Sequence, residues 1–141
     1  MTLQMNYARA PFFKEDKGFF SDVYSREWPQ LLPLLDETTG YLLNVMGLRP
    51  KLVRSSDPGI TTTKSELVLD ICRRIGAKAY LSGPLGRDYL DLGRFRDAGI
   101  EVEFYEYVHR PYHQAHGGFV SGLSMVDLLF NRAPQKGESL R

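Results

Sequence analysis

The side chains best able to do acid–base chemistry lie between positions 109 and 116. His109, His113 and His116 are spaced four and three residues apart, with Tyr112 and Gln114 among them. An imidazole titrates near neutral pH, so a histidine in this loop can take a proton from a reacting group. We predict His109 and His113 as catalytic candidates, and Tyr112 and Gln114 as hydrogen-bonding partners of a substrate. The alternative is a surface loop with incidental histidines.

The same three histidines resemble a set of metal ligands only in number. Pro111 argues against a regular helix that would place them on one face. The loop from Val108 to Gly122 contains no carboxylate or cysteine that would complete a tetrahedral set. We therefore expect no metal site here.

A second candidate site is the turn Ser82-Gly83-Pro84-Leu85-Gly86, between an apolar segment and a predicted helix. In open α/β folds, ligands bind at the carboxyl ends of strands, and helix N-termini attract anions. We predict that Ser82, Gly83, Gly86 and Tyr89 contact a sugar or nucleotide-linked substrate. The turn is neither a P-loop nor a full dinucleotide fingerprint. The alternative is a purely structural tight turn.

Hydroxyl groups also cluster at the end of a predicted strand over residues 51–56. Ser55 and Ser56 close this segment, and three threonines at 61–63 open the next helix. We predict that Ser55 and Ser56 join the same substrate crevice. Helix capping alone explains one of the threonines fully.

The elements that must position these residues alternate along the chain. Helices are predicted from about residue 21, over 33–47, 64–75, 87–97 and 124–130, and strands over 51–56, 78–81 and 100–107. Strands that alternate with helices favour parallel pairing with right-handed crossovers. We therefore predict an α/β fold with a small, mainly parallel sheet of about three strands flanked by helices.

The length predicts a single domain over residues 1–141. Residues 1–20 carry too many large aromatic groups for a solvated tail, so we expect this segment to pack on the domain. Residues 132–141 are polar, and we expect a flexible tail. A three-stranded sheet leaves exposed edges, which indicates a homo-oligomer or association with a missing N-terminal half.

Charge and composition exclude several classes of protein. The formal net charge is +1, with no basic stripe, so we expect no nucleic-acid partner. No apolar run approaches the ~20 residues of a transmembrane segment, and a signal peptide is not apparent. The single cysteine, Cys72, is predicted to be a buried core residue and fits a reducing compartment. We expect a cytoplasmic location, and no motif identifies a cofactor.

Taken together, these residues resemble the WbqC-like protein family. The resemblance rests on Tyr7-Ala8-Arg9-Ala10-Pro11-Phe12-Phe13, Gly47-Leu48, Ser55-Ser56, Tyr80-Leu81-Ser82-Gly83, Gly86, Tyr89-Leu90, Phe95, Gly99-Ile100, Val102, Phe104, Tyr112, Gln114, Phe119, Leu123-Ser124 and Asp127-Leu128-Leu129-Phe130-Asn131. Family members normally begin with a strand and a His-Gln-Pro-type motif, which is absent here. The chain therefore resembles the C-terminal part of such a protein.

The resemblance implies a role in bacterial surface-polysaccharide (O-antigen) biosynthesis. It implies a transferase that moves glycine or another small acyl group onto a sugar or nucleotide sugar. The alternative is a non-catalytic interaction or oligomerisation domain, or a truncated, inactive member of the family. A metal hydrolase built on the three histidines is the weakest interpretation.

Overall fold

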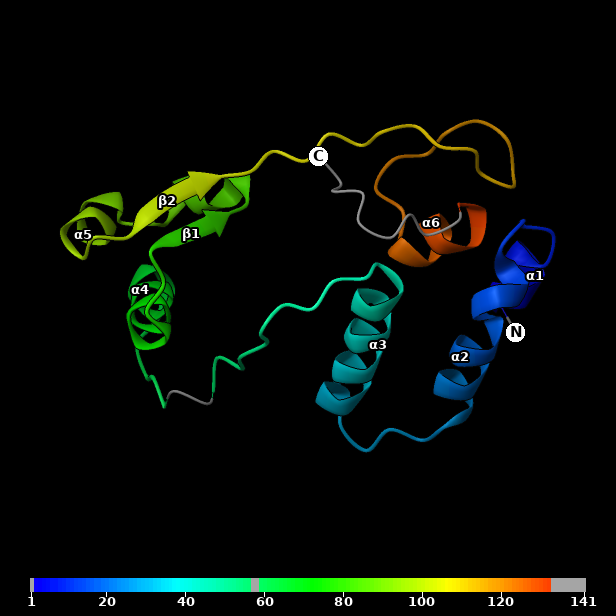
Figure 1. The fold of residues 1–141 in the computed structure, drawn as a ribbon, viewed down its shortest axis with the longest axis horizontal. Coiled ribbons are helices and arrows are strands. Elements are labelled where there is room, and N and C mark those ends of the chain that lie inside the picture. The colour runs from blue at the N-terminus through cyan, green and yellow to red at the C-terminus, as the bar shows by residue number, and fades with distance from the viewer. Residues whose placement is uncertain (1, 57–58, 133–141) are drawn as a thin grey trace. The chain divides into compact units, whose positions relative to one another are not determined.

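The computed structural model describes residues 2–56 and 59–132, which fall into two compact units (Figure 1). The first unit is Met1–Pro50 with His109–Arg141, and the second is Lys51–Val108. The single-domain organisation over residues 1–141 stays a prediction. The expected flexible tail over residues 132–141 lies outside the described residues, apart from Arg132.

The described part of the first unit is helical, with a core built from aromatic rings. Its helices are α1 (Thr2–Tyr7), α2 (Phe13–Ser25), α3 (Leu31–Val45) and α6 (Met125–Asn131). Phe130 of α6 is fully buried, and its ring meets Phe13 at 5.0 Å and Phe20 at 5.5 Å, both edge to face. Such edge-on contacts are favoured between aromatic quadrupoles. The aromatic N-terminal residues therefore pack on α6.

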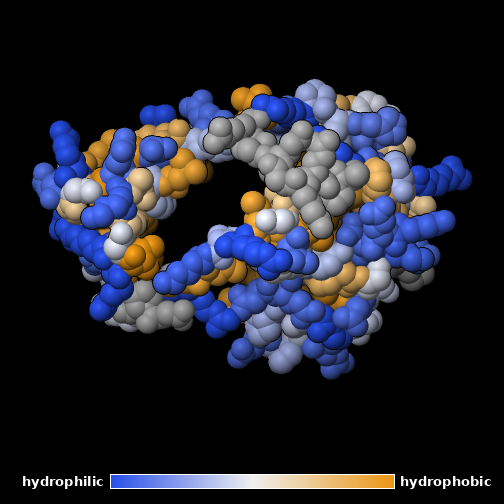
Figure 2. All heavy atoms as spheres, viewed as in Figure 1, coloured by the Kyte–Doolittle hydropathy of each residue, from blue (hydrophilic) through white to orange (hydrophobic). Residues whose placement is uncertain are grey.

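Helix α3 joins this core through Tyr41, Leu42 and Val45 and leaves much of its apolar surface exposed. The Tyr41 ring stacks on Phe19 at 3.6 Å, and its hydroxyl donates to the buried carboxylate of Asp16. No residue of α3 is fully buried, and Leu31, Leu32 and Leu35 are exposed. Figure 2 shows apolar residues at the surface of this unit.

A two-stranded parallel sheet forms the centre of the second unit. Its elements are α4 (Lys64–Ile75), β1 (Ala79–Ser82), the 3-10 helix η1 (Pro84–Asp88), α5 (Leu92–Asp97) and β2 (Glu101–Phe104). Tyr80 pairs with Val102, and Ser82 with Phe104. Helix α4 ends at Gly76, whose φ of 68° is the left-handed conformation that glycine tolerates.

The two faces of this sheet differ in burial. Tyr80, Val102 and Phe104 pack on one buried core, to which α4 contributes Leu69 and Cys72 and α5 contributes Phe95. On the opposite face, Ala79, Leu81, Glu101 and Glu103 are all exposed. Both helices therefore cover the same face of the sheet.

The predicted α/β class and the parallel pairing are confirmed, but two expected elements differ. The prediction of a third strand over residues 51–56 is wrong, because residues 51–54 are irregular and residues 55–56 form a turn. A strand pairs its backbone groups with those of a neighbouring strand, and among the described residues only β1 and β2 form such a pair. The helix expected over 87–97 is interrupted at Leu90, which is buried, and restarts after Asp91, whose carboxylate accepts from the Arg94 N–H at 3.2 Å.

Candidate functional site

The polar centre of the first unit is the carboxylate of Asp127 on α6. Asp127 is only 4% exposed, and four side chains donate to it. Its Oδ1 accepts from the Tyr7 hydroxyl at 2.9 Å and from Asn131 Nδ2 at 3.2 Å. Its Oδ2 accepts from the Tyr112 hydroxyl at 2.5 Å and from Gln114 Nε2 at 3.1 Å. A buried carboxylate needs this full set of partners, and here every donor is a neutral group.

The two tyrosines reach Asp127 from distant parts of the sequence. Tyr7 ends α1, and its ring is tilted against Phe130 at 5.2 Å. Tyr112 comes from the loop before α6, and its ring meets Phe119 edge to face at 5.5 Å. Through these hydrogen bonds Asp127 connects α1 and the loop before α6 to α6 itself.

Gln114 holds the loop closed. It is buried, its Nε2 donates to the Val120 carbonyl at 3.0 Å, and its Oε1 accepts from the Val120 N–H at 2.8 Å. Both ends of its amide are thus engaged with backbone groups. The observed role of Gln114 is to shape the loop that presents Tyr112.

Burial and the Asp127 carboxylate control the ionisation of Tyr7. Burial is the larger cause, followed by the hydrogen bond to Asp127, and together they raise the pKa of Tyr7 to about 12. The Tyr7 hydroxyl therefore keeps its proton at neutral pH. It acts as a hydrogen-bond donor and not as a base.

Asn131 leaves one polar atom of this centre without a partner. Its Nδ2 donates to the Asp127 carbonyl at 2.9 Å as well as to the carboxylate. Both of those groups are acceptors, so the amide nitrogen must face Asp127. The buried Oδ1 then has no hydrogen-bond partner among the described residues. An unpaired buried acceptor is costly, so a donor from water or a ligand would be stabilising here.

The three histidines are exposed and differ in their surroundings. His116 lies 6.5 Å from the Tyr7 ring, and its Nε2 is 2.8 Å from the Asn6 carbonyl. Donation to that carbonyl leaves Nδ1 as the basic nitrogen of a neutral ring. His109 accepts from the Gly122 N–H through Nδ1 at 3.4 Å, and His113 is exposed in the same loop. The structure thus links His116 to the Asp127 centre through Tyr7.

In the second unit, the turn from Ser82 to Gly86 is closely packed and has a structural role. Ser82 is buried, and its hydroxyl donates to the Gly83 carbonyl at 3.0 Å. A Cβ on Gly86 would lie 2.0 Å from Ser82 Oγ and 3.0 Å from Leu90 Cδ1. The packing of η1 on β1 therefore requires glycine at position 86. The predicted substrate contacts of Ser82, Gly83 and Gly86 stay predictions.

The remaining predicted substrate-binding residues also belong to the second unit. Tyr89 is exposed at the end of η1, and its hydroxyl adjoins that of Tyr80, whose pKa is raised first by burial and then by this neighbour. Ser55 and Ser56 are exposed in a turn. The structure thus brings Tyr112 and Gln114 together in one unit, and Ser82 and Gly86 together in the other.

Sequence reasoning missed Tyr7, Asp127 and Asn131 as members of one centre. A signal was present, since Asp127 interrupts an apolar run and Asn131 follows four residues later on the same helical face. An acidic side chain on an apolar face is rarely buried without partners. Tyr7 had no local signal, because it lies 120 residues from Asp127 in the sequence.

Two further features are absent from the part of the chain that the structure describes. Over 2–56 and 59–132, no group of three or more histidine, cysteine or acidic side chains is placed to hold a metal ion. Within the same residues, no helix combines the length and apolar character needed to cross a bilayer.

Comparisons with known proteins identify relatives along the whole chain. The WbqC-like protein family matches residues 1–139. The uncharacterized protein Rv1507c of Mycobacterium tuberculosis (strain ATCC 25618 / H37Rv) is 31% identical over 141 residues, which are 99% of this chain and 61% of that protein. The chain thus spans about three fifths of the length of this relative. No solved structure matches this chain significantly. The chain belongs to the WbqC-like protein family.

Proposed function

We propose that this chain acts in surface-polysaccharide (O-antigen) biosynthesis, as a transferase of glycine or a similar small acyl group. Its acceptor would be a sugar or a nucleotide-linked sugar. Membership of the WbqC-like family supports the reaction class. The observation that carries the position of the site is the Asp127 carboxylate, which holds two tyrosine hydroxyls beneath a histidine-bearing loop.

The geometry of the hydroxyl groups suits a polyhydroxylated ligand. Tyr7 and Tyr112 both donate their protons to Asp127, so each phenol oxygen presents only lone pairs on its other side. Oriented in this way, the two oxygens accept hydrogen bonds from the O–H or N–H groups of a sugar. Both tyrosines are partly exposed, whereas Asp127 is buried and acts as a positioning residue.

The loop supplies the base for acyl transfer. A neutral imidazole takes the proton of the attacking sugar hydroxyl or amino group as that group adds to the acyl carbonyl carbon. A new C–O or C–N bond forms, the bond from the acyl carbon to its carrier breaks, and the imidazolium returns the proton to the leaving carrier. His116 is the best supported base because it contacts Tyr7, and His109 and His113 are the other candidates.

A thermal-shift screen against UDP-glucose, UDP and acetyl-coenzyme A tests this function. A ligand at a hundred times its dissociation constant adds ~2.7 kcal/mol of stability, which is on the order of 10 °C in melting temperature. Replacing Tyr112 by phenylalanine should abolish most of that shift. Tyr24→Phe is the matched control, because Tyr24 is exposed in α2 and is not among the four side chains that donate to Asp127. The proposal fails if no ligand shifts the protein, or if Tyr112→Phe leaves the shift intact.

The exposed apolar surface of α3 favours a second function, that of a non-catalytic interaction or oligomerisation domain. This helix has no fully buried residue and exposes Leu31, Leu32 and Leu35. Exposed apolar patches of this kind mark association surfaces. Light scattering at micromolar concentration should then show a dimer or larger species, which Leu31→Glu with Leu35→Glu would return to a monomer. A monomeric native protein would exclude self-association.

A further inference from the structure

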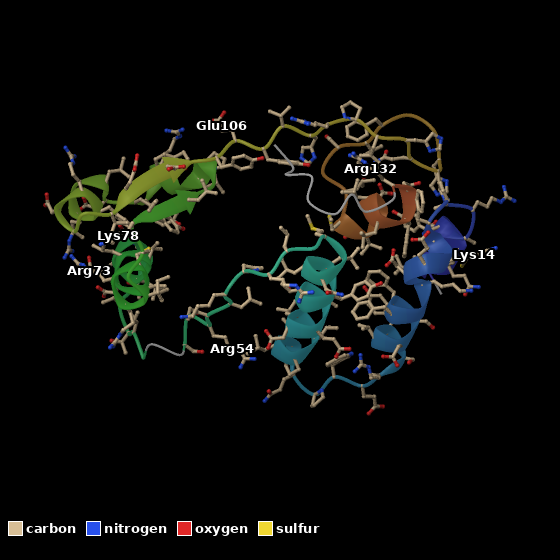
Figure 3. All side chains as sticks on the ribbon, viewed as in Figure 1. Lys14, Arg54, Arg73, Lys78, Glu106 and Arg132 are labelled. Atoms are coloured by element: carbon tan, nitrogen blue, oxygen red, sulfur yellow. The ribbon has the colours of Figure 1, made fainter. Side chains whose placement is uncertain are left out.

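A pocket of about 520 Å³ lies at the amino end of the sheet in the second unit. Its lining comes from α5, from the start of β2 and from the segments that lead into the two strands, and includes Lys78, Leu92, Arg96, Gly99, Glu101 and Val102. Figure 3 shows Lys78 at this end of the sheet and Glu106 at the other end. The pocket is therefore separate from the turn over residues 82–86, which follows β1 at its carboxyl end. A volume of this size suits a small organic ligand.

Two residues that line the pocket carry positive charges without a counter-ion. Over residues 2–56 and 59–132, neither Lys78 nor Arg96 has an ion-pair partner. Other cations nearby are paired: Arg94, also on α5, is 2.5 Å from Glu66, and this carboxylate lies 3.7 Å from Arg73. Cations that no carboxylate holds can donate charge-assisted hydrogen bonds to an anion.

The carbonyl groups that end α5 beside the pocket are already engaged. The Phe95 carbonyl accepts from the Ile100 N–H at 3.0 Å, and the Arg96 carbonyl accepts from the Gly99 N–H at 2.9 Å. Their partial negative charges, which would disfavour an anion, are offset by these donors. Gly99 has a φ of 68°, and a Cβ added to it would meet no atom within 4 Å. The pocket is therefore open beside this turn.

The other lining residues indicate what kind of anion would fit. Glu101 is exposed, and its carboxylate can accept hydrogen bonds from hydroxyl groups. Leu92 is 44% exposed and Val102 is partly buried, so the pocket also offers apolar contact. A bare inorganic anion would meet the cations but would be repelled by Glu101. A ligand with an anionic group, hydroxyl groups and a carbon skeleton could use all three kinds of contact.

We propose that this pocket binds a phosphorylated sugar. A phosphate monoester carries a charge of about −1.5 to −2 at neutral pH, which matches two cations. The planar guanidinium of Arg96 donates to two phosphate oxygens, and Lys78 adds a point charge. The sugar hydroxyls donate to Glu101, and the carbon face of the ring lies on Leu92. This site belongs to the second unit and goes beyond the proposed function, which rests on the Asp127 centre of the first unit.

Titration calorimetry of the full chain with glucose 1-phosphate tests this site. Lys78→Gln and Arg96→Gln should each weaken binding about tenfold, because each removes a charge-assisted hydrogen bond to the phosphate. Lys17→Gln, on α2, and Arg87→Gln, at the other end of the sheet, are the matched controls and should leave binding unchanged. All four side chains are exposed, so the variants should fold as the native protein does. Native affinity in both Lys78→Gln and Arg96→Gln would overturn the proposal.

Two simpler ligands separate the phosphate from the sugar. Glucose lacks the group that the cations bind, and inorganic phosphate lacks the hydroxyl and apolar contacts of the ring. Each should bind about tenfold or more weakly than glucose 1-phosphate. Inorganic phosphate that binds as tightly as glucose 1-phosphate would overturn the sugar assignment, and glucose that does so would overturn the role of the cations.

Chemical labelling locates the phosphate without any substitution. An N-hydroxysuccinimide ester acetylates exposed lysines, and peptide mass spectrometry gives the rate at each position. Saturating glucose 1-phosphate should slow the acetylation of Lys78 and leave that of Lys17 unchanged, since both are exposed and only Lys78 lines the pocket. An unchanged rate at Lys78 would overturn the proposal.

Tyr112→Phe keeps this site apart from the proposed function. It should leave the affinity for glucose 1-phosphate unchanged, because Tyr112 lies in the first unit. If it abolishes that binding, the ligand occupies the Asp127 centre and the pocket proposal fails alone. The UDP-glucose thermal shift is measured in the Arg96→Gln protein, so that the pocket contributes little to it. If that shift is absent while glucose 1-phosphate binding depends on Lys78 and Arg96, the pocket stands and the proposed function fails.

Discussion

Two carboxylates, one in each unit, show two ways of holding a negative charge. Asp127 is buried and accepts hydrogen bonds only from neutral hydroxyl and amide groups. Glu66 on α4 is partly exposed and faces two cations, with Arg94 at 2.5 Å and Arg73 at 3.7 Å. The first arrangement depends on fixed geometry, and the second on Coulomb attraction in a setting that solvent screens.

The two units also differ in how many polar side chains they bury. Among the described residues, Asp16, Gln114, Asp127 and Asn131 are buried in the first unit, and Ser82 alone among buried polar side chains lies in the second. Hydrogen bonds rigidify a buried polar network, and among the buried side-chain atoms described in the first unit Asn131 Oδ1 alone has no partner. The first unit therefore has a preorganised polar centre, whereas the second depends on apolar packing and on a close approach at Gly86.

The largest effect should come from removing the buried carboxylate. Asp127→Ala leaves the hydroxyls of Tyr7 and Tyr112 and the Gln114 amide without their acceptor, so we expect a loss of about 3 kcal/mol or more in the free energy of unfolding. Urea denaturation measures it. Asp22→Ala, which removes an exposed aspartate of α2 paired with Arg26, should cost under about 1 kcal/mol. Equal losses would remove the distinction between the two kinds of carboxylate.

Packing at Gly86 should give the next largest effect. Gly86→Ala forces the new Cβ against Ser82 Oγ, and we expect a cost of about 1–3 kcal/mol from overpacking. Gly83→Ala is the matched control, since no atom lies within 4 Å of its added Cβ. Ser82→Ala should restore part of the loss in a double variant. A harmless Gly86→Ala would mean that the turn is looser than the structure shows.

Alkaline pH should weaken the centre around Asp127 through Tyr7. Below the ordinary pKa of 10, Tyr7 is protonated in both folded and unfolded chains, so its contribution to stability is complete. Between pH 10 and about 12 the unfolded chain releases this proton first, and the contribution is lost as the pH rises through the folded value. Tyr7→Phe should cost about 1–2 kcal/mol at neutral pH and flatten the alkaline decline. The measurement is urea denaturation from pH 9 to 12, with Tyr24→Phe as control. An unchanged slope in Tyr7→Phe would contradict the hydrogen bond to Asp127.

Local patterns in the sequence predicted the elements whose stability is local. The helix over 64–75 ends at Gly76 as its glycine indicated, and Ser124 caps α6 by accepting from the Val126 N–H at 3.3 Å. The central strand and the parallel pairing followed from alternation of strands and helices. The prediction of a strand over residues 51–56 is wrong because strand propensity does not show whether a segment pairs with a neighbouring strand.

The Asp127 centre was only half visible in the sequence. The sequence predicts Tyr112 and Gln114 as hydrogen-bonding partners of a substrate because they lie in the polar loop beside the strand ends, and in the structure both donate to Asp127. Residues 51–56 and the Asp127 centre show the same limit of sequence analysis. Contacts between residues far apart in the chain depend on the fold, which local residue spacing does not reveal.

The smallest effect should come from Glu66, and its salt dependence completes the comparison. Glu66→Gln keeps the shape of the side chain and removes the charge that faces Arg94 and Arg73. We expect a loss under about 1 kcal/mol, because partly exposed pairs gain little over their hydration. That loss should vanish in 1 M salt, where the screening length falls to about 3 Å, whereas the loss from Asp127→Ala should persist. Urea denaturation at low and high salt measures both variants. A Glu66→Gln loss that survives high salt would mean that the second unit, too, stabilises charge by fixed geometry.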